Sequence, residues 1–100
     1  MSRYIRDLAR QRINRLFILA GSIFHESPEL ANRYVQLARL ISMRCKVRIP
    51  NKWRRRFCHH CGAFLVPGVN CRVRIRNNRM KHIVITCFSC NRQMRYPIET

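Results

Sequence analysis

Two pairs of cysteines with the Cys-x-x-Cys spacing are the residues of this chain best suited to chemistry. Cys58 and Cys61 form the first pair, and Cys87 and Cys90 form the second. Each pair can present two thiolates from a tight turn, so the two pairs together supply the four ligands of a tetrahedral zinc ion. Four thiolates leave no open position for a water molecule. We therefore expect one structural Zn²⁺ rather than a catalytic one.

The other cysteines and the neighbouring histidines are weaker candidates for a metal site. Cys45 and Cys71 stand alone in the sequence, and their predicted role is that of small buried apolar side chains. His59 and His60 lie inside the first pair, where they could replace a thiolate but more often point outward or support a ligand. No alternation of strands and helices accompanies the cysteine pairs, which disfavours a thioredoxin-like redox motif.

The charge of the chain indicates a polyanionic partner. Its 100 residues carry a formal net charge of +17, with 21 lysines and arginines against 4 acidic residues. Most of the cations are arginines, whose planar guanidinium makes paired hydrogen bonds to phosphate and stacks on bases. Nucleic acid is therefore the favoured partner, ahead of a membrane surface.

The composition also limits the functions to be expected. A chain of 100 residues has room for one small domain or two small units, and not for a large enzyme pocket. The few carboxylates are scattered and no glycine-rich phosphate loop is present, so we expect no catalytic residues in this chain. Neither a secretory leader nor a membrane-spanning segment is evident. We expect a cytoplasmic protein whose cysteines stay reduced or bind metal.

Residues 1–45 have the pattern of two amphipathic helices. Apolar residues recur at steps of three and four from Ile5 to Phe24, and a second series runs from Leu30 to about Met43. Gly21 weakens the first series near its end, where the helix could fray or bend. The segment Ser27-Pro28-Glu29 has the features of a new helix start, with a capping serine and a proline at the first helical position. The short link predicts an antiparallel helical hairpin.

The apolar stripes of this hairpin are wider than one pair of helices needs. The surplus could be covered by the second half of the chain or by a partner protein, and the alternative is that these residues are internal core. The candidate partner-binding residues are Ile5, Leu16, Phe17, Tyr34 and Val35.

Residues 46–57 are predicted to be a basic hinge. The helical period stops here and Pro50 interrupts regular structure. Trp53 could stack on a base, although burial beside Phe57 is the commoner fate of a single tryptophan. The candidate RNA-binding residues of this segment are Lys46, Arg48, Lys52, Arg54, Arg55 and Arg56.

Residues 58–100 have the pattern of short strands. The run from Cys71 to Arg76 alternates with period two, Asn77-Asn78 offers a turn, and His82 to Thr86 returns as a partner strand. A third strand is predicted around Gln93 to Tyr96, and Pro67-Gly68 marks a loop. The alternation places three further candidate RNA-binding residues on one face: Arg72, Arg74 and Arg76. The predicted fold is α+β, with an N-terminal antiparallel two-helix hairpin followed by a C-terminal zinc ribbon of three short antiparallel strands.

The order and spacing of several segments resemble a known family. These segments are Arg33-Tyr34-Val35-Gln36-Leu37-Ala38-Arg39, Val47-Arg48-Ile49-Pro50, Arg56-Phe57-Cys58-His59-His60-Cys61, the run from Leu65 to Arg74 with its Pro-Gly-x-Asn motif, Cys87 to Cys90, and Arg95-Tyr96-Pro97. Together they look like the zinc-ribbon subunit family of archaeal ribonuclease P, protein component 4, which has a eukaryotic relative in the nuclear enzyme. The resemblance covers nearly the whole chain.

The resemblance implies a protein cofactor of a catalytic RNA. In that family the RNA subunit cleaves the 5′ leader from precursor tRNA, and this type of subunit pairs with a Sm-like β-barrel protein and helps the RNA to fold and hold substrate. The family's zinc ligands correspond to Cys58, Cys61, Cys87 and Cys90, and its partner-binding helices to the N-terminal hairpin. The chain is thus expected to bind ribonuclease P RNA and precursor tRNA without doing chemistry itself. The alternatives are a ribosomal or other ribonucleoprotein zinc-ribbon protein and a transcription-associated zinc ribbon.

Overall fold

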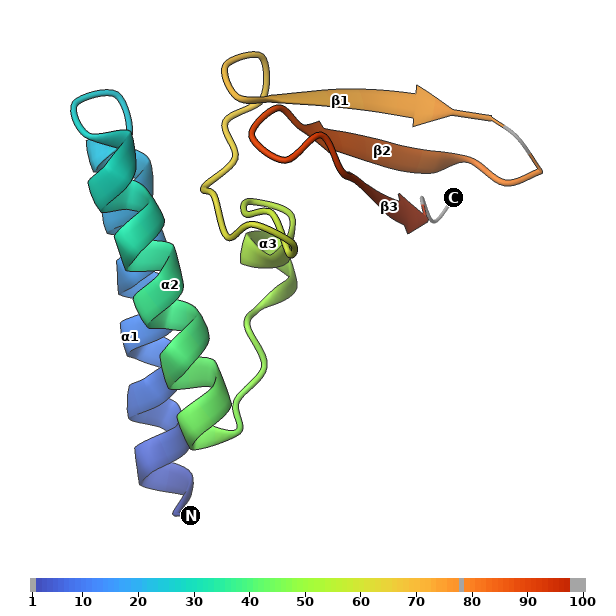
Figure 1. Cartoon of the computed structure of the whole chain (residues 1–100). Coiled ribbons are helices and arrows are strands. Elements are labelled where there is room, and N and C mark those ends of the chain that lie inside the picture. Colours follow the sequence, from blue (N-terminus) through green and yellow to red (C-terminus); the bar gives the residue numbers. More distant parts are fainter. Residues whose placement is uncertain (1, 78, 98–100) are drawn as a thin grey trace. The chain divides into compact units, whose positions relative to one another are not determined.

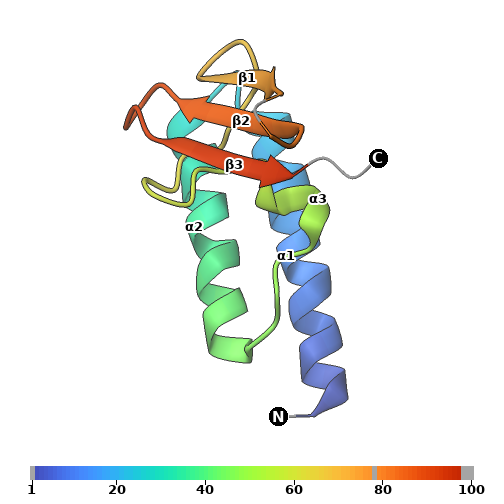
Figure 2. The ribbon, with the colours of Figure 1, turned by 90° about the vertical axis from the view of Figure 1, so that its right-hand side faces the viewer.

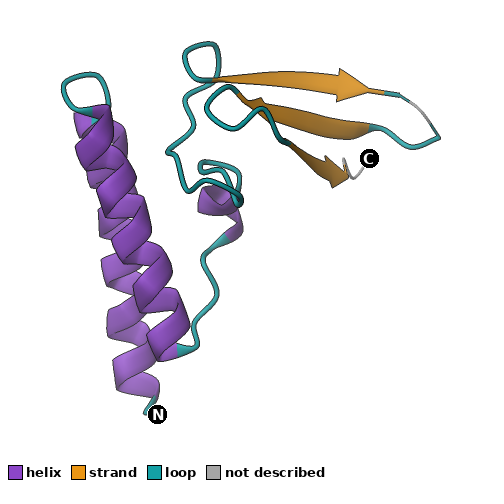
Figure 3. Ribbon diagram, in the orientation of Figure 1, coloured by secondary structure: helices purple, strands orange, loops and turns teal. Residues whose placement is uncertain are grey.

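The computed structural model of the chain describes residues 2–77 and 79–97 and contains two compact units (Figure 1). Unit 1 comprises Met1–Phe57 and Gly62–Phe64, and unit 2 comprises Cys58–Cys61 and Leu65–Thr100. The helices lie in unit 1 and the strands in unit 2, as the colours of Figure 3 show. This is the predicted α+β fold.

Unit 1 is built on two long helices, α1 (Arg3–Ile23) and α2 (Pro28–Cys45). Each is capped by a serine: the hydroxyl of Ser2 accepts from the N–H of Ile5, and that of Ser27 from the N–H of Leu30. The predicted helix start at Ser27 is confirmed, with Pro28 in the first turn. α1 continues through Gly21 without a break, and α2 runs two residues past the predicted end at Met43.

The two long helices pack closely because their facing residues are small. The buried face combines alanines with a few larger side chains, of which Ile13, Phe17 and Val35 are fully buried. The buried residues of the two helices are Ala9, Ile13, Phe17, Ala20, Ala31, Val35 and Ala38. Alanine at four of these positions lets the helix axes approach, and the larger side chains fill the remaining space.

The segment after α2 contains a short helix, α3 (Asn51–Arg54), that the sequence did not predict. Pro50 precedes it at the N-cap position, which is compatible with the fixed φ of proline. Trp53 in α3 stacks on Phe17 with ring centroids 5.3 Å apart, and its indole N–H donates to the side-chain oxygen of Asn14 at 2.8 Å. Trp53 therefore packs within unit 1, as the alternative to stacking on an RNA base predicted.

Two phenylalanines complete the core of unit 1. Phe57 and Phe64 form an isolated antiparallel bridge, and their rings lie 5.6 Å from Phe17 and 5.8 Å from Phe24, respectively. The backbone N–H of Phe64 donates to the side-chain oxygen of Asn32 on α2 at 2.8 Å. The end of the segment predicted as a hinge is therefore packed on the helices through its aromatic residues.

Unit 2 is a three-stranded antiparallel sheet with the order β1-β2-β3, which can be followed in Figure 2. The strands are β1 (Cys71–Arg76), β2 (His82–Cys87) and β3 (Gln93–Pro97), in agreement with the predicted positions. Of the predicted turn Asn77-Asn78, Asn78 lies outside the described residues.

The strand register gives the sheet two different faces. Residues directly opposite each other share a face, so the pairs Arg72–Thr86, Arg74–Val84 and Arg76–His82 fix the first face. β3 adds Gln93 opposite Thr86 and Arg95 opposite Val84. We call this set the basic face: Arg72, Arg74, Arg76, His82, Val84, Thr86, Gln93 and Arg95.

The second face of the sheet carries the core of unit 2. The buried cluster there consists of Cys58, Leu65, Cys71, Ile85, Cys87 and Met94. The alternation predicted for β1 is confirmed, but the apolar residues beyond Cys71 remain largely open: Val73 is 45% exposed and Ile75 is 71% exposed. Half of the residues in this buried cluster are thus cysteines.

Among the described residues, no helix combines the length and the apolar character needed to cross a membrane.

Candidate metal centre and nucleic-acid interface

The four cysteines of the two pairs meet at one point in unit 2. Their sulfur atoms all lie within 4.8 Å of one another, and the Sγ–Sγ distances are 3.6 Å for both Cys58–Cys90 and Cys61–Cys87. Four sulfurs placed about 2.3 Å from a central zinc ion at the corners of a tetrahedron are separated by about 3.8 Å. The spacing therefore fits a tetrahedral metal site and is far too long for disulfide bonds.

Each cysteine pair is shaped by a residue in the left-handed backbone region. Gly62 follows the first pair with φ of 80°, and Asn91 follows the second with φ of 60°. Glycine and asparagine are the residues that adopt this conformation at least cost. The N–H of Asn91 donates to the carbonyl of Cys87 at 2.8 Å, and the N–H of Cys61 donates to Sγ of Cys58 at 3.5 Å. These turns aim both sulfurs of a pair at the same point.

The environment of the thiols favours deprotonation at one site and opposes it at another. Burial raises the pKa of Cys58, but hydrogen bonds from the backbone N–H groups of Cys61 and His60 and the contact with Cys90 outweigh it, so the pKa falls to about 7. For Cys90, the backbone N–H of Arg92 lowers the pKa. Burial and the neighbouring sulfurs of Cys58 and Cys87 raise it by more, so the pKa of Cys90 lies above its ordinary value. Several thiolates repel one another at this distance, and a divalent cation relieves that repulsion.

The remaining cysteines and histidines near the pairs are not among the four clustered ligands. Cys71 is buried in the core of unit 2, opposite Cys87 in the β1–β2 register, and Cys45 is half-buried at the end of α2. Cys71 therefore has the buried role that the sequence predicted. His59 and His60 are exposed, with His60 beside Arg92 at 3.3 Å.

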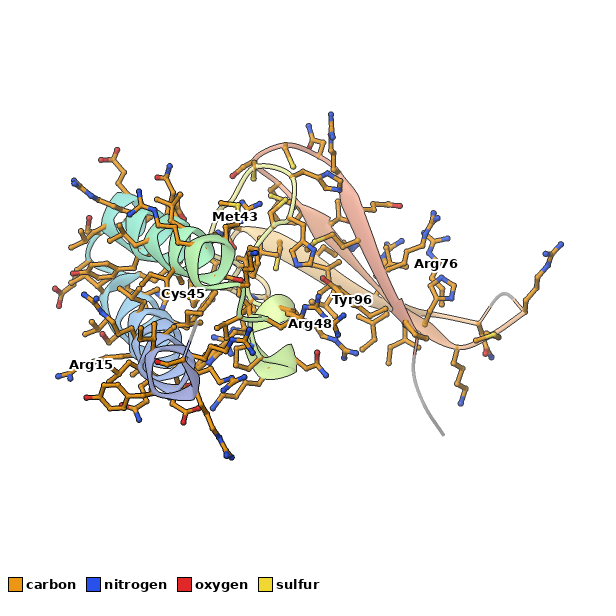
Figure 4. The ribbon with its side chains drawn as sticks, turned by 90° about the horizontal axis from the view of Figure 1, so that it is seen from below. Arg15, Met43, Cys45, Arg48, Arg76 and Tyr96 are labelled. Carbon is orange, nitrogen blue, oxygen red and sulfur yellow. The ribbon has the colours of Figure 1, made fainter. Side chains whose placement is uncertain are left out.

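The candidate RNA-binding residues of the 46–57 segment are all exposed. Two of them also lie over aromatic rings of unit 1: Lys52 over Trp53 at 5.1 Å and Arg56 over Phe64 at 5.5 Å. Arg39 on α2 lies over Phe57 in the same way, at 5.4 Å. These cation–π contacts restrain the long side chains while their charged ends stay accessible. Arg48 is one of the residues labelled in Figure 4.

The candidate RNA-binding residues of β1 share their face with a residue that sequence reasoning did not select. Arg72, Arg74 and Arg76 are all exposed, and Arg95 on β3 joins them across the sheet. The alternation of Gln93 and Arg95 around the buried Met94 is the sequence signal that could have identified it.

The candidate partner-binding residues of the helices divide into exposed and buried positions. Phe17 and Val35 are fully buried inside unit 1 and have no surface to offer. Ile5 is 46% exposed, and Leu16 and Tyr34 are half-buried. Phe17 and Val35 are therefore internal core residues, which was the alternative to a partner-binding role.

Exposed and half-buried apolar residues follow one side of each long helix. On α1 they recur at steps of three, four or eight residues, and on α2 at steps of three or four, so each set lies along one side of its helix. On α1 this side differs from that of Phe17, which contacts Trp53 and Phe57, and on α2 it differs from that of Asn32, which contacts Phe64. We call this set the apolar flank: Ile5, Leu8, Leu16, Leu19, Ile23, Leu30, Tyr34, Leu37 and Ile41.

Comparison with known proteins gives this arrangement a family. Residues 12–91 match the model of the RNAse P Rpr2/Rpp21/SNM1 subunit domain. The chain belongs to this family. It is 57% identical over 90 residues to ribonuclease P protein component 4 of Pyrococcus furiosus, covering 90% of this chain and 77% of the relative.

Two solved structures resemble this chain in fold. A chain in a cryo-EM structure of archaeal ribonuclease P with mature tRNA superimposes with a TM-score of 0.86 at 44% identity, covering 91% of this chain and 77% of that one. A structure described as Pfu Rpp21 matches with a TM-score of 0.62 at 56% identity, covering 90% of this chain and 99% of that one. The family resemblance seen in the sequence is thus confirmed.

The Pro-Gly-x-Asn motif that contributed to the resemblance has a structural role. Gly68 has a φ of 83°, and the side-chain oxygen of Asn70 accepts a hydrogen bond of 2.7 Å from the N–H of Val66. The carbonyl of Asn70 accepts a further bond from the N–H of Phe88, in the second cysteine pair. In this member of the ribonuclease P family, the motif therefore holds the loop before β1 against the turn of the second cysteine pair.

Proposed function

We propose that this chain is a non-catalytic, RNA-binding subunit of ribonuclease P that assists the catalytic RNA in 5′ maturation of precursor tRNA in the cytoplasm. The observation that carries the proposal is the close match, in sequence and in fold, to a chain of an archaeal ribonuclease P bound to tRNA. The family match favours this function over the ribosomal and transcription-associated alternatives.

The chemistry of the cysteine cluster supports one structural Zn²⁺. Cys58, Cys61, Cys87 and Cys90 would hold it, and four sulfur donors suit zinc better than oxygen-preferring metals. Bound zinc would fix the two turns to each other and complete the core of unit 2.

The exposed cations support contact with the RNA backbone. Residues 30–98 contain no acidic side chain, and both the 46–57 segment and the basic face lie within this range. Lys46, Arg48, Lys52, Arg54, Arg55, Arg56, Arg72, Arg74 and Arg76 are the residues proposed to contact ribonuclease P RNA and precursor tRNA. Binding through phosphates makes the affinity fall steeply with salt.

The apolar flank supports a protein partner, and we assign it to the Sm-like barrel subunit of ribonuclease P. Leu8, Leu19 and Leu37 of this set are each 40–42% exposed, a larger apolar surface than isolated exposed residues would give. A β-barrel protein with a complementary apolar patch would bury this surface.

The experiment that tests the function is a precursor-tRNA cleavage assay with the protein alone, the catalytic RNA alone, and both together with the barrel subunit. We expect stimulation of cleavage only when the catalytic RNA is present, because the residues that the structure describes offer phosphate neutralisation and a candidate metal site already closed by four sulfurs. Cleavage by RNA-free protein that disappears on substitution of a single side chain would overturn the proposal. Absence of stimulation under all conditions would overturn it as well.

A further inference from the structure

The basic face contains a pocket that combines residues from all three strands. Its volume is about 310 Å³, and it is lined by Arg76 from β1, His82 and Val84 from β2, and Gln93 and Arg95 from β3. All five residues belong to unit 2 and to the same face of the sheet. Figure 4 labels Arg76 among the side chains of the sheet.

The strand register explains why the two arginines converge there. Arg95 lies beside Val84 in the central strand, and Arg76 lies beside His82, the next residue of β2 on this face. Neighbouring strands are about 4.8 Å apart and successive residues on one face about 6.8 Å apart, so the two arginines start from positions that long side chains can bridge. Val84 is only 3% exposed and forms an apolar floor between them.

The charges in this pocket have no acidic partner among the described residues of unit 2. The last carboxylate before residue 99 is Glu29, which lies in α2 of unit 1. Asp7 pairs with Arg10, also in unit 1. Two guanidinium groups that line the same pocket, with no carboxylate of the described part of unit 2 beside them, favour an anion between them, and the amide of Gln93 offers a neutral donor.

The composition of the face indicates which part of a nucleic acid it would contact. It carries no phenylalanine, tyrosine or tryptophan, because Tyr96, the aromatic residue of β3, belongs to the opposite face. Sheets that bind unstacked bases use aromatic side chains as stacking platforms, whereas this face offers mainly donors for phosphate oxygens.

We propose that Arg76, Gln93 and Arg95, with His82 and Val84 as pocket walls, form a binding site for one phosphate of the RNA backbone. The inference rests on the proposed function, because it assumes that RNA is the anion. It adds β3 to the contact surface and assigns to this sheet a recognition of RNA that is independent of base identity.

The test compares Arg95→Gln with Arg79→Gln. Both variants lose one positive charge in unit 2, but Arg79 lies between β1 and β2 and does not line the pocket. Binding to two RNA hairpins of unrelated sequence is measured by fluorescence anisotropy over a range of salt concentrations. For Arg95→Gln, the slope of log affinity against log salt should fall by about 0.9 on both hairpins, whereas Arg79→Gln should leave it nearly unchanged.

Two further variants separate charge from shape. Arg95→Lys keeps the charge and should retain most of the salt slope, while Gln93→Glu places a carboxylate in the pocket and should weaken binding at least as much as Arg95→Gln. Retained zinc and an unchanged circular dichroism spectrum in each variant ensure that the sheet is intact.

Equal decreases of the salt slope for Arg95→Gln and Arg79→Gln would contradict a phosphate site in this pocket. They would show that RNA binding depends only on the total positive charge of the unit. A loss confined to one hairpin sequence would overturn recognition of the backbone. The cleavage assay separates these results from failure of the proposed function. If the wild-type protein stimulates the catalytic RNA while the two variants bind alike, only the pocket is wrong; if the wild-type protein gives no stimulation, the ribonuclease P function itself fails.

Discussion

At the scale of single residues, the cysteines differ sharply in what they contribute. Cys58 is fully buried within the four-sulfur cluster, whereas Cys45 is half-buried at the end of α2 in unit 1. Cys58→Ser replaces a thiolate by a hydroxyl that zinc binds poorly, so we expect loss of the bound metal and of the β-sheet. Cys45→Ser is the control and should retain both.

Native mass spectrometry gives the metal content for this comparison, and circular dichroism follows the sheet. One zinc per chain is expected for the wild-type protein and for Cys45→Ser. A Cys58→Ser variant that keeps its zinc and its unfolding temperature would contradict the assignment of this cysteine as a ligand.

The hydrogen bond from Trp53 to Asn14 is a second feature of individual residues. Trp53→Phe keeps a ring that can stack on Phe17 but leaves the side-chain oxygen of Asn14 without this donor. We expect the free energy of unfolding to fall by about 1 kcal/mol, the usual net value of one hydrogen bond. In a double-mutant cycle with Asn14→Ala, measured by chemical denaturation, the two effects should be clearly less than additive. Full additivity would mean that the bond contributes nothing.

At the scale of elements, the two long helices have one side that forms the core of unit 1 and another that carries the apolar flank, the surface proposed for a partner. Leu19 and Leu37 lie on the apolar flank and are 40% and 41% exposed, whereas Val35 is fully buried. Leu19→Glu and Leu37→Glu add charge to surface positions, so the fold should be preserved while binding to the Sm-like barrel subunit falls by at least tenfold. Val35→Glu is the contrasting variant and should unfold unit 1, because it buries an unpaired charge.

Isothermal titration calorimetry with the purified barrel subunit measures this effect, and helical circular dichroism checks the fold. If Leu19→Glu and Leu37→Glu bind the barrel subunit as tightly as the wild-type protein, the partner surface lies elsewhere on the chain.

At the scale of the whole molecule, stability is divided between two cores of different chemistry. Unit 1 is held by alanine-mediated helix packing and by aromatic residues, and the core of unit 2 contains cysteines of the four-sulfur cluster, the proposed zinc site. Removal of zinc with a chelator should therefore abolish the signal of the β-sheet while most of the helical signal remains.

Circular dichroism and amide hydrogen exchange can follow the two units separately during this titration. We expect protection of amides in β2 to be lost first, and protection in α1 and α2 to survive. Simultaneous loss of both would show that the two units unfold as a single cooperative body.

Local signals in the sequence were sufficient for much of the fold. The spacing of Cys58, Cys61, Cys87 and Cys90 predicted that their four sulfurs cluster, because ligand chemistry limits what two such pairs can do together. Ser27-Pro28 marked the start of α2, and the alternation in β1 predicted which residues share a face, because capping and strand periodicity depend only on neighbouring residues. The motifs were also specific enough to identify the ribonuclease P family.

The tertiary structure alone decided the features that depend on residues far apart in the chain. An apolar stripe does not reveal which of its members another segment covers, so Phe17 and Leu16 looked alike in the sequence although only Phe17 lies beneath Trp53 and Phe57. For the same reason, the aromatic residues that hold the 46–57 segment to the helices were not recognised as anchors. The position of Arg95 near Arg76 depends on the pairing of β2 with both of its neighbours, and strand pairing is a long-range property that short sequence patterns do not contain.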